Sequence, residues 1–296
     1  MTSGFQNLQG DLRLNEPLAK HTSWRTGGNA NRFYRPGGIK DLAVFLAQLP
    51  ENEPLLWLGL GSNLLVRDGG FSGTVISTSG TLQQLTVDGQ TITVEVGVYC
   101  AKLAKQAARA GLSGTAFLAG IPGTFGGALA MNAGAHSSET WSIVRDVTTI
   151  DRRGVIRVRK LEDFKISYRH VELPLGEWFV SATLNLTIGN AEDEAEEIKA
   201  LLKRRNVSQP TNQPCAGSVF RNPEGDFAGR LIELCNLKGL KVGGASVSEK
   251  HANFIVNEGT ASAADIETLI LLVQQKVEQM QGVKLVTEVH ILGEVE

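Results

Sequence analysis

Two short glycine-rich segments carry the clearest chemical signal in this chain. The longer one, GIPGTFGGALAMNAGA at residues 120–135, has five glycines, four alanines and no charged side chain. The shorter one, GLGSN at residues 59–63, follows the apolar run 55–58. Glycine exposes main-chain N–H groups, and successive N–H groups form concavities that bind anions. Two such segments predict a large phosphate-bearing ligand held by the backbone, and tight turns without a ligand are the alternative.

The expected ligand is a dinucleotide whose pyrophosphate contacts main-chain amides and small hydroxyls. Neither segment contains the GxxxxGK[ST] pattern of a P-loop. The shorter segment lies between two expected strands and has Leu64 where a third glycine would be needed, so it is not a Rossmann fingerprint either. The residues expected to bind this ligand are Gly59, Gly61, Ser62, Asn63, Gly120, Gly123, Thr124, Gly126, Gly127, Asn132, Ala133 and Gly134.

Three further residues could do acid–base or electrostatic chemistry. Ser218, in CAGSVFRNP, has no GxSxG pattern around it, so its hydroxyl is a useful proton donor only toward a strongly basic carbanion or enolate. Arg169, in SYR, could hold a carboxylate or a developing oxyanion. Glu288, in KLVTEVHIL, shares an alternating face with Val286 and Leu292, where a carboxylate must be paired or protonated. The alternatives are a serine in a turn for Ser218, a surface salt bridge for Arg169 and a structural ion pair for Glu288.

The remaining polar clusters give weaker signals. Lys203, Arg204 and Arg205 end an expected helix, so they either complement its dipole or, with Gln209 nearby, bind a nucleotide diphosphate. The histidines have no partners at metal-ligand spacing, and no metal site is expected. The three cysteines show no CxxC pattern, which favours free buried thiols in a reducing cytoplasm.

The elements that position these residues follow from the hydrophobic pattern. Helices are expected at 39–49, 100–110, 191–206, 227–236 and, after the capping box of Ser262 and Asp265, up to Gly282. Strands are expected at 55–58, 64–66, within 74–98, as a hairpin over 144–158 with its turn at Arg153–Gly154, at 178–188 and at 285–292. A composition shift at Gly189–Asn190 suggests a domain boundary near residue 190.

Length and composition narrow the functional class. The chain has 296 residues, and its formal net charge of −2 favours neither nucleic acid nor an anionic membrane as a partner. The N-terminus lacks the apolar core of a signal peptide, and no aliphatic run is long enough to span a bilayer. These features predict a soluble cytoplasmic protein, and we favour a monomer.

Taken together, these motifs resemble the family of UDP-N-acetylenolpyruvoylglucosamine reductases. The matching stretches extend over nearly the whole chain, in order: HTSWRTGG (21–28), GLGSNLLV, GIPGTFGGALAMNAGA, SYR, AGSVFRNP, LKGLKVGGASVSEKHANFIVN (237–257) and LVTEVHIL. The short connection between Arg169 and the strand near Trp178 is similar to the subclass that lacks an extra substrate-covering loop. The continuation HVELP after Arg169 departs from the family's more usual serine-containing sequence.

The resemblance implies a fold and a reaction. The fold would be α+β, with a vanillyl-alcohol-oxidase-type (PCMH-type) FAD-binding domain followed by an α+β substrate domain. The FAD-binding domain would consist of two subdomains, 1–78 and 79–190, and the substrate domain would comprise 191–296. The strand at 284–296 is expected to pack on the first subdomain. FAD would be bound noncovalently, and NADPH would reduce it as co-substrate. Reduction of UDP-N-acetylglucosamine enolpyruvate would then give UDP-N-acetylmuramate for peptidoglycan.

The resemblance also assigns roles to residues. Ser218 takes the family's proton-donor position, and Arg169 and Glu288 take the positions that stabilise the substrate's carboxylate and enolate. The residues that we expect to bind the UDP-sugar are Tyr168, Lys203, Arg205, Gln209 and Asn222. Two alternatives remain: another flavin-dependent oxidase of the same fold, and a nucleotide-binding scaffold without turnover.

Overall fold

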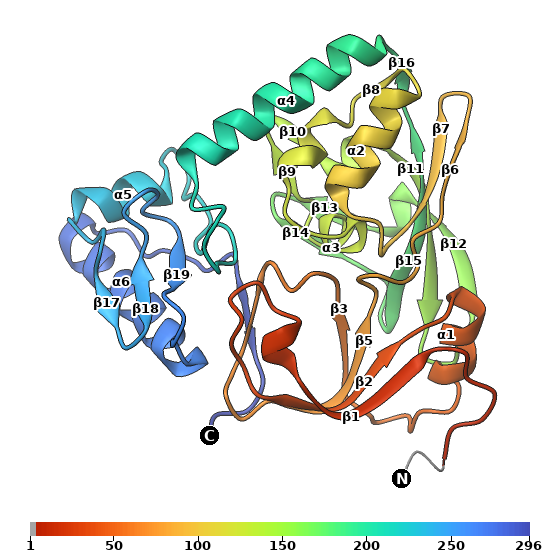
Figure 1. Cartoon of the computed structure of the whole chain (residues 1–296), viewed down its shortest axis with the longest axis horizontal. Coiled ribbons are helices and arrows are strands. Elements are labelled where there is room, and N and C mark those ends of the chain that lie inside the picture. The colour runs from red at the N-terminus through yellow and green to blue at the C-terminus, as the bar shows by residue number, and fades with distance from the viewer. Residues whose placement is uncertain (1–3) are drawn as a thin grey trace. The chain divides into compact units, whose positions relative to one another are not determined.

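The computed structural model describes residues 4–296, which divide into two compact units (Figure 1). Unit 1 comprises Arg32–Leu60 and Gly73–Lys203, together with the chain up to Leu14. Unit 2 comprises Asn15–Asn31, Gly61–Ser72 and Arg204–Glu296. Each unit combines helices with strands and has its own hydrophobic core, which confirms the expected α+β class.

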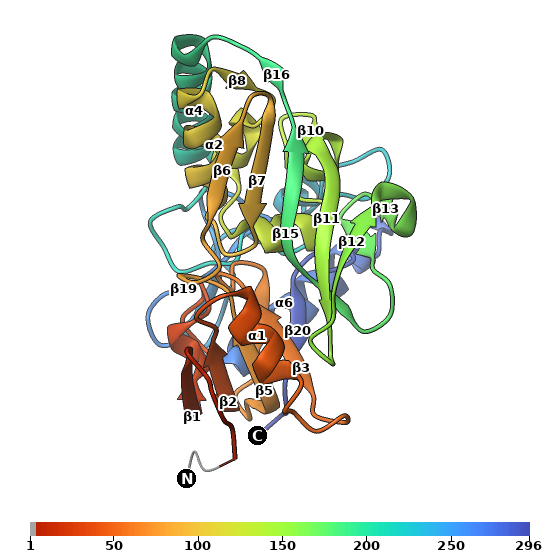
Figure 2. The same cartoon turned by 90° about the vertical axis from the view of Figure 1, so that its right-hand side faces the viewer.

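The main sheet of unit 1 is antiparallel and has the strand order β12-β11-β15-β7-β6 (Figure 2). Its strands are β6 (Leu85–Asp88), β7 (Thr91–Glu95), β11 (Val144–Asp151), β12 (Ile156–Lys160) and β15 (Glu177–Asn185). The predicted hairpin is confirmed: β11 pairs with β12 from Asp146 opposite Lys160 to Ile150 opposite Ile156. Gly154, with φ +78°, lies in its turn, where the left-handed conformation favours glycine.

A second sheet has the strand order β1-β2-β5-β3, and its greater part belongs to unit 1. Its strands are β1 (Asp11–Pro17), β2 (Asn29–Arg35), β3 (Leu55–Leu58) and β5 (Phe71–Ser77). Strand β3 runs parallel to β5, with Leu55 opposite Thr74 and Leu58 opposite Ser77. Strand β3 is the last strand of this sheet, and Gly59 directly follows its final residue, Leu58.

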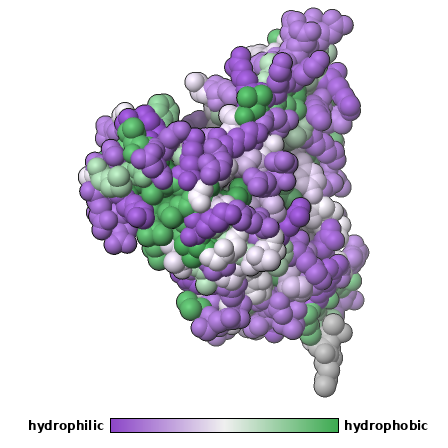
Figure 3. Space-filling model, turned by 60° about the vertical axis from the view of Figure 1, so that its left-hand side comes forward, coloured by the Kyte–Doolittle hydropathy of each residue, from purple (hydrophilic) through white to green (hydrophobic). Residues whose placement is uncertain are grey.

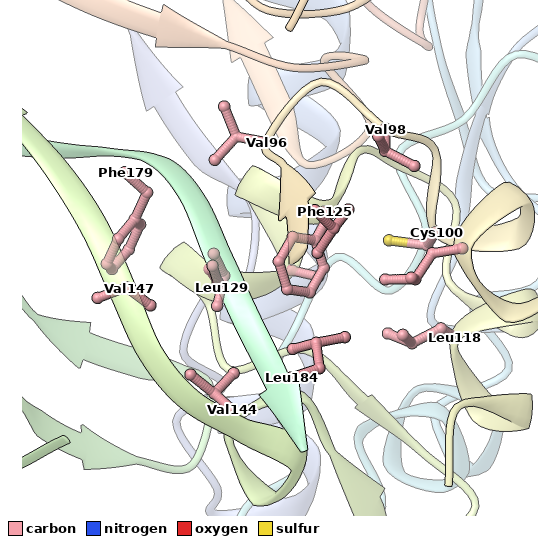
Figure 4. Packing of buried hydrophobic residues seen from close by; sticks show 14 of the residues in the cluster. Val96, Val98, Cys100, Leu118, Phe125, Leu129, Val144, Val147, Phe179 and Leu184 are labelled. Carbon is pink, nitrogen blue, oxygen red and sulfur yellow. The ribbon is translucent and has the colours of Figure 1, made fainter. Parts of the chain in front are cut away.

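Three helices support the sheets of unit 1: α1 (Ile39–Leu46), α2 (Cys100–Arg109) and α3 (Phe125–Ala130). Helix α2 buries Leu103 together with small alanines, which allow close packing. Helix α3 inserts Phe125 and Leu129 among strand residues such as Val147 and Leu184 (Figure 4). Because Phe125 and Leu129 are fully buried, they anchor the long glycine-rich segment from within the core.

Short elements complete unit 1. Three two-strand ribbons are β8 (Leu112–Ser113) with β16 (Thr187–Ile188), β9 (Gly134–Ala135) with β10 (Ser138–Glu139), and β13 (Lys165–Ser167) with β14 (His170–Glu172). The 3-10 segments are Ala116–Gly120, Thr140–Ile143 and Leu161–Asp163; Leu18–Lys20 lies in unit 2. The expected strand at 178–188 is thus interrupted: β15 ends at Asn185, and the amide of Leu186 bonds to Gln90 instead.

Unit 2 is built around a three-stranded antiparallel sheet of the order β17-β18-β19. Its elements are β4 (Leu64–Val66), α5 (Ala228–Leu234), β17 (Lys241–Val242), β18 (Ala245–Val247), β19 (Ile255–Asn257), α6 (Ala263–Gln281) and β20 (His290–Leu292). Helix α4 (Ala191–Ser208) begins in unit 1 and ends in unit 2. The predicted capping box is confirmed, because Ser262 Oγ accepts from the Asp265 amide at 3.0 Å and Asp265 Oδ2 accepts from the Ser262 amide at 3.1 Å.

The C-terminal segment differs from the expected continuous strand over 285–292. Only β20 is a regular strand, and it pairs in parallel with β4, His290 opposite Leu64. Residues 285–289 instead lie along an irregular stretch with a single bridge, Thr287 opposite Phe220. Leu285 and Val289 are buried, whereas Val286 is 59% exposed. The expectation that Glu288 lies on an apolar face was therefore wrong; the buried face is the opposite one.

The surface of the described residues is mostly hydrophilic on the face drawn in Figure 3. Hydrophobic residues gather in a smaller area of that face. Within residues 4–296 we find no helix with the length and apolar character needed to cross a bilayer. The three-part division at residues 78 and 190 stays a prediction.

Candidate active site

The two glycine-rich segments meet in unit 1, at Gly59 and Thr124. A Cβ atom placed on Gly59 would lie 2.3 Å from Thr124 Oγ1, so only glycine allows this approach. Thr124 is 1% exposed, and its hydroxyl is buried with no hydrogen-bond partner among the described residues. A buried hydroxyl without a partner costs about 1–3 kcal/mol. A ligand that accepts from this hydroxyl would remove that cost.

The glycines of these segments have two different reasons to be glycine. At Gly61 (φ +63°), Gly126 and Gly134, an added Cβ would approach other parts of the protein to 2.3, 2.8 and 2.5 Å, respectively. At Gly120 and Gly127, by contrast, nothing lies within 4 Å of an added Cβ. The protein alone therefore explains the first three glycines, whereas the last two leave open space that a ligand could occupy.

Not every N–H group of the long segment is available to an anion. The amides of Phe125 and Gly126 donate to the carbonyls of Val98 and Val96 at 2.8 and 2.9 Å. The side chain of Asn132 is also used by the protein, since its Nδ2 donates to Glu139 at 2.8 Å and its Oδ1 accepts from the Trp141 amide at 3.2 Å. These bonds fix the shape of the segment.

Arg169 is held by the same glycine-rich segment. It lies in the tight turn between β13 and β14 with φ +55°, a conformation that is uncommon for residues other than glycine. Its Nη2 donates to the Gly134 carbonyl at 2.8 Å and its Nη1 to the Asn132 carbonyl at 3.4 Å. The guanidinium is therefore placed by the backbone that is expected to hold the cofactor.

Ser218 and Glu288 are fixed in register within unit 2. The Glu288 amide donates to the Val219 carbonyl at 2.8 Å, and the Arg221 amide donates to the Val286 carbonyl at 2.9 Å. Segments 70 residues apart in the sequence thus run side by side. The serine and the glutamate, which the sequence marks separately, therefore lie on neighbouring extended segments of unit 2.

The shorter glycine-rich segment also supports Glu288. Asn63 Nδ2 donates to the Glu288 carbonyl at 2.9 Å, and the Asn63 carbonyl accepts from the His290 amide at 3.0 Å. Asn63 thereby bonds to the main chain on both sides of Val289. A residue expected to bind the cofactor consequently sets the position of a residue expected to act on the substrate.

A cavity of about 420 Å³ opens beside Ser218 in unit 2. Its lining includes three cations, Arg230, Lys238 and Lys250, and one carboxylate, Glu233. The rest of its wall is formed by Ser218, Asn222, Phe227, Gly229, His251, Ala252 and Asn253. A cavity of this size suits a small molecule, and the excess of cations favours an anionic one.

The charges around this cavity are partly balanced by the protein. Arg230 pairs with Asp226, and Lys238 bonds to Glu233 at 2.5 Å, whereas Lys250 donates to the neutral Asn206 carbonyl. Burial and the nearby Lys238 charge lower the pKa of His251. Its Nδ1 accepts from the Asn253 amide at 3.2 Å, so the neutral ring carries its proton on Nε2.

Two regions of the chain match the models of known domain families. Residues 30–159 match the model of an FAD binding domain, and residues 209–292 match the C-terminal domain of UDP-N-acetylenolpyruvoylglucosamine reductase. UDP-N-acetylenolpyruvoylglucosamine reductase from Legionella pneumophila (strain Lens) is 59% identical over 99% of this chain and 96% of its own. The chain belongs to this reductase family. The resemblance inferred from the motifs is thereby confirmed.

Two further relatives extend the match. The reductase of the same name from Alkalilimnicola ehrlichii is 58% identical over 96% of both chains. The crystal structure of UDP-N-acetylenolpyruvylglucosamine reductase from Thermus caldophilus has a TM-score of 0.82 and 33% identity, covering 96% of this chain and 99% of that one. The likeness to these reductases in sequence and in fold therefore extends over nearly the whole length of both chains.

The residues expected to bind substrate lie in different places. Asn222 lines the cavity, and its Oδ1 also accepts from the Ala228 amide at the start of α5. Arg205 is half-buried and bonds to Gln209 at 3.2 Å. Lys203 is exposed and belongs to unit 1, as does Tyr168, whose ring lies 4.9 Å from the Arg169 guanidinium carbon. Of these five residues, only Asn222 contributes to the wall beside Ser218.

Sequence reasoning missed most of the charged wall of the cavity. Arg230, Lys238, Lys250 and His251 are spread over more than twenty residues, and each has ordinary neighbours in the sequence. No local spacing could have grouped them, because the turns after α5 and β18 bring them together. The same applies to Asn253, whose neighbours in HANFIVN do not indicate a place in a cavity wall.

Proposed function

We propose that this protein reduces UDP-N-acetylglucosamine enolpyruvate to UDP-N-acetylmuramate, with noncovalently bound FAD and with NADPH as co-substrate. The observation that carries the proposal is the placement of Ser218 at the wall of a cation-rich cavity, in fixed register with Glu288. An anionic UDP-sugar suits that cavity. Family membership supplies the reaction class, and the local geometry supports individual roles.

The residues of the two glycine-rich segments fit a flavin dinucleotide. Thr124 offers a buried hydroxyl that lacks a protein partner among the described residues, and Gly120 and Gly127 leave space for a ligand. We therefore assign FAD to these segments, with Ser62 and Asn63 as further contacts. When bound, the flavin supplies the hydride chemistry that protein side chains cannot provide. The protein contributes position, charge and a proton.

Each of the three polar residues has a distinct proposed role. Hydride addition to the methylene carbon of the enol ether leaves negative charge on the adjacent carbon and its carboxylate. Arg169 binds this carboxylate, since its guanidinium is held rigidly by neutral carbonyls. Glu288 stabilises the same charge by donating a hydrogen bond when protonated. Ser218 then gives its proton to the carbon and regains one from solvent.

The cavity wall holds the charged part of the substrate. Lys250 has a neutral partner, so its charge is available to a diphosphate, whereas the charges of Arg230 and Lys238 are partly offset by carboxylates. The Nε2–H of neutral His251 and the amide of Asn222 add uncharged donors. We infer that these residues recognise the nucleotide portion of the UDP-sugar.

The decisive experiment follows the flavin through two half-reactions. The purified protein should show a flavin absorbance spectrum that NADPH bleaches and that UDP-N-acetylglucosamine enolpyruvate restores under anaerobic conditions. A colourless protein that does not take up FAD would contradict the proposal. Rapid reoxidation by oxygen, with none by the enolpyruvyl substrate, would favour the flavin oxidase alternative instead.

The Ser218→Ala variant tests the proton donor. Flavin reduction by NADPH should stay within about twofold of wild type, and reoxidation by substrate should slow by about 10²–10⁴-fold. Ser208→Ala removes an exposed hydroxyl at the end of α4 and serves as a control that should change neither rate. Equal slowing of both half-reactions by Ser218→Ala would refute the role assigned to Ser218.

A further inference from the structure

The buried side chain of Asn253 clamps the peptide that follows Ser218. Its Oδ1 accepts from the Phe220 amide at 3.0 Å, and its Nδ2 donates to the Phe220 carbonyl at 2.8 Å. Its own main-chain carbonyl accepts from the Val219 amide at 2.9 Å. Asn253 is 3% exposed. One residue therefore makes three hydrogen bonds to two consecutive residues, as a neighbouring β-strand would.

The opposite edge of this segment is held by residues 286–288, which precede β20. The Val219 carbonyl accepts from the Glu288 amide, and the Arg221 amide donates to Val286. All five main-chain polar groups from the Val219 amide to the Arg221 amide are thus paired, two of them with the side chain of Asn253. The segment cannot shift without breaking bonds on both sides.

The residue before Ser218 provides no comparable restraint. Gly217 has φ +69°, and nothing lies within 4 Å of a Cβ added to it. Glycine at such an open position leaves the chain conformationally free on that side. On that side the nearest main-chain pairing is the bridge between Cys215 and Val256, so the bonds of Val219 and Phe220 are the restraints closest to Ser218.

We propose that Asn253 is a positioning residue for proton transfer by Ser218. The inference rests on the proposed proton-donor role of Ser218. Asn253 acts through the Val219–Phe220 backbone, since both polar ends of its carboxamide are used on Phe220. Only a side chain that accepts and donates at once can do this. Leucine would leave two buried polar groups without partners, and a charged carboxylate would face the Phe220 carbonyl.

The chemistry of the clamp suggests an informative variant, Asn253→Asp. An ionised carboxylate accepts from the Phe220 amide but repels the Phe220 carbonyl, whereas a protonated carboxyl group restores both bonds. Burial against a carbonyl raises the pKa of such a carboxyl group. The variant should thus be impaired at alkaline pH and recover as the pH falls, which a merely structural defect would not do.

The test measures both half-reactions of the flavin-loaded protein between about pH 5.5 and 8.5. At the alkaline end, Asn253→Asp should slow flavin reoxidation by substrate by about 10–100-fold, the cost of a small misplacement of a reacting group. Reduction by NADPH should stay within about twofold of wild type. The variant-to-wild-type ratio of reoxidation rates should rise toward one as the pH is lowered. Using this ratio cancels the titration of His251, Glu233, Lys238 and Glu288, which face this region in both proteins.

The variant Asn257→Asp is the reference for a general loss of stability. Asn257 is 5% exposed and also bonds to the main chain through both ends of its carboxamide, to Trp24, Gly259 and Ala261. Asn257→Asp should therefore cost similar stability without a selective, pH-reversible loss of reoxidation. The same selective loss in Asn257→Asp, equal slowing of both half-reactions in Asn253→Asp, or a ratio that does not change with pH would overturn the inference.

Ser218→Ala separates this inference from the proposed function. If Ser218→Ala leaves reoxidation unchanged, then the proton-donor role itself is wrong, and the positioning role fails with it. If Ser218→Ala slows reoxidation selectively but Asn253→Asp does not, then only the role of Asn253 is overturned.

Discussion

Asn63 Nδ2 donates a hydrogen bond to the main-chain carbonyl of Glu288, with 2.9 Å between the two atoms. The bond joins the GLGSN segment to the C-terminal segment that carries Glu288, and the two residues are 225 positions apart in the sequence. Because the Asn63 carbonyl also accepts from His290, the two segments are held in one register. The position of Glu288 therefore depends on the segment expected to bind the cofactor.

Asn63→Ala should therefore affect stability and turnover together. The substitution leaves the Glu288 carbonyl without this donor, which should lower the unfolding free energy by about 1–3 kcal/mol. The turnover number should also fall, since Glu288 loses a support. Gln274→Ala is the matched control, because Gln274 Nε2 donates to the Leu285 carbonyl at the same distance, away from the glycine-rich segment. Urea denaturation and steady-state kinetics would measure both effects, and a turnover loss in the control as large as in Asn63→Ala would argue against a specific role.

Much of the fold could be predicted from the sequence where local signals are strong. The capping box of Ser262 and Asp265 and the left-handed Gly282 bound α6 as expected. The glycine-rich segments stand out in the sequence because residues 120–135 are mostly small and carry no charge. Local patterns of this kind are determined by neighbours along the chain, and tertiary contacts do not override them here.

The features that could not be predicted depend on contacts between distant segments. Period-two alternation predicts Glu288 with Val286 on a buried face, but Leu285 and Val289 are the buried residues. Alternation alone does not say which of the two faces packs on the core, and here the contact with the segment around Phe220 decides it. Asn253 belongs to no chemical motif of its own, and its role depends on its bonds to Phe220. Side chains that bond to the main chain of a distant segment leave no periodic signature.

Gly127→Ala should separate cofactor binding from folding. Gly127 lies within α3, and nothing is within 4 Å of an added Cβ, so alanine should raise the stability of the apoprotein by about 0.5–1 kcal/mol through its better helix propensity. If FAD occupies this space, its affinity should fall by about tenfold or more. Thermal melting of the apoprotein and titration with FAD would measure the two effects. Unchanged FAD affinity would exclude Gly127 from the cofactor site.

Gly59→Ala, unlike Gly127→Ala, should destabilise the apoprotein. An added Cβ would lie 2.3 Å from Thr124 Oγ1, so the apoprotein itself should be destabilised by about 1–3 kcal/mol through overpacking. The double variant Gly59→Ala/Thr124→Ala removes the clashing hydroxyl and should regain most of that stability. It should not regain FAD affinity, because the hydroxyl proposed to contact the cofactor is gone. Recovery of full FAD affinity in the double variant would rule out that contact.

The ion pair between Arg67 and Glu267 should make the stability of unit 2 sensitive to acid. Arg67 donates to both carboxylate oxygens of Glu267, at 2.9 and 2.8 Å, and these bonds lower the pKa of Glu267 below its ordinary value of 4.5. The stabilisation is therefore fully present above about pH 4.5 and is lost as the pH falls through the lowered pKa. Glu267→Gln should flatten this part of the stability profile in urea denaturation. Glu278→Gln, an exposed position on the same helix, should leave the profile as in wild type.

His251 should add a second pH dependence, because the folded state favours its neutral form. Burial, with the Lys238 charge as a second cause, lowers its pKa below the ordinary value of 6.5, so the unfolded chain takes up the proton more readily than the folded one. The unfolding free energy should therefore decrease as the pH falls below about 6.5, before the loss due to Glu267 begins. Protonation would also replace the acceptor that Nδ1 offers to the Asn253 amide. His251→Gln stays neutral and should abolish this decrease, whereas His170→Gln, at an exposed position of unit 1, should retain it. If His251→Gln lost stability over the same pH interval as wild type, another group would have to be responsible.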